Sequence, residues 1–134
     1  MRFASRRVSG VDGDDFRLAI DQFNGRGFYA CHDTLERLWL EAKPADRKFY
    51  QGLLQLAVAY YHLSQNNWRG CVILLGEGVS KLADYLPSYH GIHLESLVES
   101  SQENLQELQA LGSDQVRAFD AARIPLIGWC QGEL

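Results

Sequence analysis

The sequence predicts an all-α domain, a compact helical bundle of about five main helices followed by a short C-terminal helix. Two observations support this prediction. Apolar residues recur at intervals of three and four in five separate segments, which is the spacing of one helix face. No segment has the alternating pattern of a strand, and no hairpin turn signal competes with the helices.

The first two helices are predicted over residues 14–24 and 28–42. Asn24-Gly25 ends the first helix, and the second stops before Pro44 because the residue preceding a proline avoids helical backbone. Its inward face is expected to carry Phe28, Cys31, Leu35, Leu38, Trp39 and Ala42. Its solvent face is expected to carry Asp33, Thr34, Arg37 and Glu41.

The third and fourth helices are predicted over residues 46–65 and 68–86, as an antiparallel hairpin that turns at Asn66-Asn67. The third is the most apolar, so it belongs in the middle of the bundle. Gly70, Gly76 and Gly78 each weaken the fourth helix by about 1 kcal/mol relative to alanine. We therefore expect another backbone to approach closely at one or more of them.

A loop over residues 87–91 leads to a fifth predicted helix over residues 94–111, after which Ser113 can cap the short last helix. Residues 124–134 contain Pro125 and Gly128 and are interpreted as an extended apolar tail. The tail is expected either across the bundle or in a partner subunit. Residues 1–12 are interpreted as a flexible arm, and residues 1–134 as one domain.

Charge and composition exclude several classes of protein. The net charge is −4, and the only basic cluster is Arg2, Arg6 and Arg7, so nucleic acid is not expected as a ligand. Three widely spaced cysteines without a Cys-x-x-Cys pair signal neither a disulfide framework nor a zinc knuckle. No apolar stretch suits a secretory signal or a membrane span. We expect a cytoplasmic protein without a cofactor.

One polar constellation stands out on the second predicted helix. His32, Glu36 and Trp39 are spaced by four and three, so they share a face with Phe28 and Leu35 that is expected to point inward. A buried carboxylate that lacks a partner costs about 1–3 kcal/mol or more. Glu36 therefore requires a partner from another helix.

The third predicted helix offers such partners. Four of its polar residues fall within about 80° of one another on the helical wheel, namely Arg47, Gln51, Gln55 and His62. Antiparallel packing across the Pro44 turn would bring His32 and Glu36 to these residues, with Arg47 near the end of the second helix. The predicted ligand-binding or polar cluster comprises His32, Glu36, Trp39, Arg47, Gln51, Gln55 and His62.

Several interpretations of this cluster stay open. It can be a structural hydrogen-bond network, or a site for a small polar ligand in a binding or interaction module, with a homo-oligomer formed through the apolar tail. The alternative is a metal-dependent enzyme, hydrolytic in type, that uses His32, Glu36 and His62. The sequence contains no His-Glu-x-x-His pair and no nucleophile beside Glu36, which counts against that alternative. No catalytic residue is therefore assigned.

Residues 32–39 reproduce a His-x-x-x-Glu-x-x-Trp signature, and the chain resembles the bacterial and archaeal family called domain of unknown function 309 over roughly residues 16–95. The resemblance implies a compact helical fold, an uncharacterised activity and no particular substrate. Cys31 and His93 depart from it, standing where alanine and aspartate are expected, and histidine caps a helix poorly. The other matching positions are Phe23, Asn24, Gly27, Phe28, residues 47–55, His62, Asn66, Gly70, residues 82–85, Pro87, Gly91 and Ile92.

Overall fold

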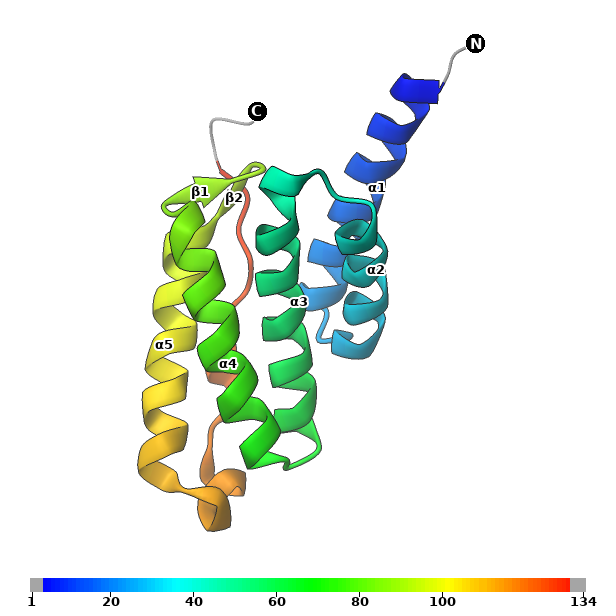
Figure 1. Cartoon of the computed structure of the whole chain (residues 1–134). Helices are drawn as coiled ribbons and strands as arrows, with labels where there is room; N and C mark the ends of the chain where they lie inside the picture. The colour runs from blue at the N-terminus through cyan, green and yellow to red at the C-terminus, as the bar shows by residue number, and fades with distance from the viewer. Residues whose placement is uncertain (1–3, 131–134) are drawn as a thin grey trace.

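The computed structural model describes the backbone of residues 4–130 and the side chains of residues 13–130. It confirms the all-α bundle (Figure 1). The five main helices are α1 (Ala4–Asn24), α2 (Phe28–Leu40), α3 (Pro44–Ser64), α4 (Trp68–Leu82) and α5 (Leu94–Leu111). Short 3-10 helices cover Ala83–Tyr85, Ser113–Ala118 and Ala121–Arg123, and two short strands, β1 (Ser88–Tyr89) and β2 (Ile92–His93), precede α5.

Helix α3 occupies the middle of the bundle, between α2 and α4 (Figure 1). Helix α1 packs beside α2, and α5 packs beside α4 on the other side. Phe49, Leu56 and Tyr60 of α3 are fully buried, as expected for the most apolar helix of the chain. The core therefore forms along α3, and the neighbouring helices pack around it.

Helices α3 and α4 approach each other tightly where Gly52 meets Gly78. A Cβ atom at Gly78 would lie 3.0 Å from the backbone oxygen of Gly52 and 2.8 Å from Leu56. A Cβ atom at Gly52 would lie 2.8 Å from Leu82. The expectation that a backbone approaches one of the α4 glycines is confirmed at Gly78, since a larger residue there would push the two helices apart.

Helix α1 begins at Ala4, so residues 4–12 of the expected arm have helical backbone. No proline interrupts this stretch, and its one glycine, Gly10, weakens a helix by only about 1 kcal/mol. Residues 1–3 of the expected arm lie outside the described residues.

The connection between α4 and α5 differs from the sequence-based expectation. Helix α4 ends at Leu82 rather than at residue 86, and an antiparallel hairpin in which Ser88 pairs with His93 starts in the expected loop and extends beyond it. The two turn residues, His90 and Gly91, have φ angles of 49° and 80°. Positive φ at both positions is typical of a type I′ turn. The hairpin was missed because Asn-Gly, not His-Gly, is the usual signal for that turn.

The C-terminal segment lies along its own bundle, which is one of the two expected placements. Ile124 and Ile127 are buried, and Arg26 donates a hydrogen bond to the backbone oxygen of Ile124 at 2.8 Å. Trp129 forms an isolated bridge with Ile92 of β2. Residues 131–134 of the expected tail lie outside the described residues.

Neither α5 nor the 3-10 helix Ser113–Ala118 has a side-chain cap at its start. His93 precedes α5 and makes no side-chain capping bond, as its identity predicted. Gly112, not Ser113, is the residue before the 3-10 helix Ser113–Ala118.

Within the described residues, none of the helices has the length and hydrophobicity that crossing a bilayer requires.

Candidate ligand site between two helices

The orientation of α2 decides which of its polar residues are buried. Thr34 is only 2% exposed, and its hydroxyl donates a hydrogen bond to Gln22 Oε1 of α1 at 2.8 Å. Glu36 follows two residues later, so it points about 160° away from Thr34 around the helix. The structure accordingly places Glu36 in solvent. The expectations of an inward Glu36 and of an exposed Thr34 are both wrong, because the buried face is centred closer to Thr34 than the apolar pattern suggested.

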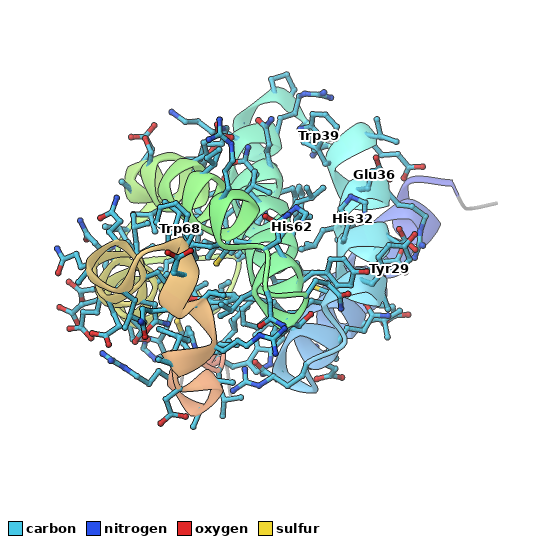
Figure 2. All side chains as sticks on the ribbon, turned by 90° about the horizontal axis from the view of Figure 1, so that it is seen from below. Tyr29, His32, Glu36, Trp39, His62 and Trp68 are labelled. Carbon is cyan, nitrogen blue, oxygen red and sulfur yellow. The ribbon has the colours of Figure 1, made fainter. Side chains whose placement is uncertain are left out.

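His32 lies at the edge of this buried face, with 28% of its side chain exposed. Its Nδ1 atom is 3.2 Å from Asp33 Oδ1. An ionised carboxylate only accepts hydrogen bonds, so Nδ1 is the donor and Nε2 of a neutral His32 carries the free lone pair. Figure 2 shows Tyr29, His32, Glu36 and Trp39 following one another along α2.

A hollow of about 150 Å³ lies between α2 and α3 beside His32. Phe28, Tyr29 and His32 line it from α2, and a second set lines it from α3. Tyr29 is 64% exposed, and its ring centroid lies 5.6 Å from that of Tyr61. The α3 residues are Val58, Tyr61 and His62. The hollow thus has apolar and aromatic walls and an imidazole from each helix (Figure 2).

The tautomer of His62 follows from its neighbour Asn67. The backbone N–H of Gly70 donates to Asn67 Oδ1 at 3.0 Å, which fixes the orientation of the Asn67 amide. Asn67 Nδ2 lies 3.2 Å from His62 Nδ1. Because the amide nitrogen can only donate, His62 Nδ1 accepts, and a neutral His62 carries its proton on Nε2.

The remaining predicted site residues do not join His32 and Glu36. The Arg47 guanidinium carbon lies 5.3 Å from the Trp39 ring centroid, so these two residues form a cation–π pair at the end of α2. Gln55 donates to Glu77 of α4 at 3.0 Å, and its own Oε1 is buried without a hydrogen-bond partner. Gln51 is half-buried on α3. The expected buried cluster of seven residues is therefore not formed as one unit.

The sequence interpretation missed a buried polar network in the core. The hydroxyl of Tyr60 lies 2.9 Å from Ser101 Oγ, and Asn104 Nδ2 donates to Tyr60 Oη at 3.2 Å and to the backbone of Arg123 at 3.0 Å. Burial raises the pKa of Tyr60 to about 12. Ser101 and Asn104 fall in register with Leu97 and Leu108 on one face of α5, so spacing alone could have revealed them.

A second missed cluster joins the hairpin to the start of α3. Tyr89 donates to Asp46 Oδ1 at 2.6 Å, and His90 Nε2 lies 3.3 Å from Asp46 Oδ2. The hydrogen bond to the Asp46 carboxylate raises the pKa of Tyr89 to about 12. The His90 ring stacks on Tyr50 with an interplanar angle of 13°. These contacts hold the hairpin against the bundle.

Two of the three cysteines are packing residues. Cys31 and Cys71 are buried, and burial raises the pKa of each thiol to about 12. A thiol that stays protonated at neutral pH is a poor nucleophile. Cys31 therefore does not serve as the nucleophile that Glu36 lacks.

Comparisons with known proteins agree with the resemblance seen in the sequence. Residues 16–74 match the family described as Domain of unknown function (DUF309). The chain is 34% identical over 95 residues to the uncharacterized protein YpuF of Bacillus subtilis (strain 168), and the match covers 66% of this chain. It covers 54% of that relative, so the chain spans about half of its length. No solved structure matches. Residues 16–74, which hold α2, α3 and the hollow between them, therefore carry the match to the domain of unknown function 309 family.

Proposed function

We propose that this domain binds a small, partly polar ligand in the hollow between α2 and α3. The observation that supports the proposal is that His32 of α2 and His62 of α3 border one hollow whose other walls are apolar or aromatic. Small-molecule sites are typically concave and mostly apolar, with a few polar groups that orient the ligand. This hollow has that composition, with polar groups supplied by two helices.

The size and the hydrogen-bonding groups of the hollow limit the ligand. A volume of about 150 Å³ suits a molecule of one ring. His32 has an acceptor at Nε2 because Asp33 engages its Nδ1, and His62 has a donor at Nε2 because Asn67 engages its Nδ1. A single aromatic ring that bears a hydroxyl group, which both donates and accepts, matches these properties.

A metal-dependent hydrolase that uses His32, Glu36 and His62 is the weaker candidate. Asn67 already engages His62 Nδ1, and the carboxylate of Glu36 faces solvent rather than a closed site. In the apolar tail, Ile124 and Ile127 are buried against their own bundle, which leaves Leu126 and Trp129 as the large apolar side chains exposed in its described part. We therefore propose ligand binding without assigning a catalytic residue.

The test uses phenol as the probe, titrated into the ¹⁵N-labelled chain while amide shifts are followed by NMR. Saturable shifts are expected for residues of α2 and α3 around the hollow. Val58→Trp fills the hollow and should abolish these shifts, whereas Ile73→Trp, on an exposed position of α4, should leave them unchanged. The proposal is rejected if phenol causes no saturable shifts, or if Val58→Trp binds it as well as the wild type.

A further inference from the structure

We propose that His32, Asp33 and Glu36 bind one divalent transition-metal ion on the solvent side of α2. This site shares the His32 ring with the hollow but uses its other nitrogen, Nδ1, so ion binding must displace the Nδ1 proton that Asp33 otherwise accepts. It does not require a ligand in the hollow. Within the part of the chain whose side chains are described, these three residues form the group in which three metal-ligand atoms lie within 4.8 Å of one another. The group combines one imidazole nitrogen with two carboxylates.

The distances between the three ligand atoms are close to those found around one metal ion. His32 Nδ1 and Asp33 Oδ1 are 3.2 Å apart, and adjacent ligands with bonds of about 2.1 Å to one ion lie about 3.0 Å apart in octahedral and about 3.4 Å apart in tetrahedral coordination. Glu36 lies one helical turn after His32, so its carboxylate is on the same side of α2. Two ligands on one ion lie at most about 4.2 Å apart. Small rotations of these exposed carboxylates bring all three atoms within that limit.

The charges around the group favour a cation. Asp33 makes its side-chain contact with His32, and no lysine or arginine among the described side chains pairs with Asp33 or Glu36. Two arginines of α2 and α3 have other partners. Arg37 pairs with Asp15 at 3.6 Å, and Arg47 lies over the Trp39 ring. Two carboxylates therefore stand side by side without a basic partner, and a bound cation would remove their mutual repulsion.

The donor set selects among metals. An imidazole nitrogen with two carboxylate oxygens suits Zn²⁺, Mn²⁺ and Co²⁺, whereas Mg²⁺ and Ca²⁺ prefer oxygen ligands alone. Asp33 is 56% exposed, so water molecules can complete the coordination. Zn²⁺ is the most informative probe, because removal of the His32 imidazole should weaken the binding of Zn²⁺ more than that of the other two metals.

The experiment is calorimetric titration of ZnCl₂ into the full chain, prepared without a histidine tag and stripped with a chelator. One zinc ion per chain is expected. Glu36→Gln and Asp33→Asn should each weaken binding about 10- to 100-fold, and His32→Ala should reduce it below detection. MgCl₂ should give no comparable binding. All three variants should melt at the wild-type temperature, since they change side chains at the surface or at its edge.

Matched controls are His93→Ala and Glu99→Gln, which remove an exposed imidazole and an exposed carboxylate elsewhere. Both should bind zinc like the wild type. The proposal is overturned if zinc does not bind, if His32→Ala binds it normally, or if His93→Ala loses it equally. Val58→Trp leaves all three ligands in place, so it should still bind zinc. A chain that binds zinc but not phenol rejects the hollow alone, and the reverse result rejects the ion site alone.

Discussion

The side-chain amide of Asn24 and the backbone of Ile127 are joined by two hydrogen bonds. Asn24 Nδ2 donates to Ile127 O at 3.0 Å, and Ile127 N donates to Asn24 Oδ1 at 2.7 Å. The two residues are 103 positions apart, so this pair connects the last residue of α1 to the C-terminal segment. Asn24 thus satisfies both backbone groups of a residue whose side chain is buried in the core.

Asn24→Ala should destabilise the fold by about 1–3 kcal/mol, because it removes both hydrogen bonds and leaves the Ile127 backbone groups without partners. Urea unfolding followed by circular dichroism measures this change. Gln102→Ala, at an exposed position of α5, should stay within about 0.5 kcal/mol of the wild type. Equal stability of the two variants would show that the two hydrogen bonds between Asn24 and Ile127 add no net stability to the fold.

Local sequence spacing predicted the helices well. The helix predicted over residues 94–111 coincides with α5, and the one predicted over residues 46–65 differs from α3 by two residues or fewer at each end. This success has a physical reason. Helix bounds depend on side chains three and four residues apart and on capping and breaking residues, all of which are local.

The site was harder to predict because it depends on the rotation of α2 about its own axis. Thr34 reads as polar in the sequence, and its partner, Gln22, lies on another helix. Once Thr34 is buried, Glu36 must face solvent. The hollow likewise depends on how α2 and α3 pack, so nothing in the local sequence marks Val58 and Tyr61 as its walls. Interactions between helices, rather than propensity, decided these positions.

Two glycines of α4 should respond to alanine in opposite directions. A Cβ atom at Gly76 would meet only Leu105, at 3.9 Å, so Gly76→Ala should stabilise the chain by about 0.5–1 kcal/mol through its higher helix propensity. A Cβ atom at Gly78 would press on the backbone of Gly52, so Gly78→Ala should destabilise it by about 1–3 kcal/mol. Thermal unfolding of the two variants tests the tight α3–α4 contact, which would be refuted by a stabilised Gly78→Ala.

The Tyr60 hydroxyl should contribute to stability through its two partners. Tyr60→Phe leaves Ser101 Oγ buried without its tyrosine partner and should destabilise the fold by about 1–3 kcal/mol. In the double variant Tyr60→Phe/Ser101→Ala, the loss should be smaller than the sum of the single losses. Tyr61→Phe, which changes a half-buried tyrosine of the same helix, is the control and should be nearly neutral. Strictly additive losses would mean that Tyr60 and Ser101 do not interact.

The buried thiols should make the fold less stable at alkaline pH. Burial raises the pKa of Cys31 and of Cys71 from 9.0 to about 12. Above pH 9 the unfolded chain therefore releases protons that the folded chain retains, so each thiol favours unfolding more strongly as the pH rises toward 12. The stabilising contribution is complete below pH 9. Above pH 9, the free energy of unfolding falls by up to about 1.4 kcal/mol per pH unit for each thiol.

Urea unfolding at pH 8 and pH 10 measures this effect. The double variant Cys31→Ala/Cys71→Ala should be less stable than the wild type at pH 8, because two buried side chains become smaller. Its stability should nevertheless fall less between the two pH values, since neither thiol remains to titrate. Val72→Ala loses packing but keeps both thiols, so it should show the wild-type decrease. If the double variant also showed the wild-type decrease, the alkaline instability would have to come from groups other than these two cysteines.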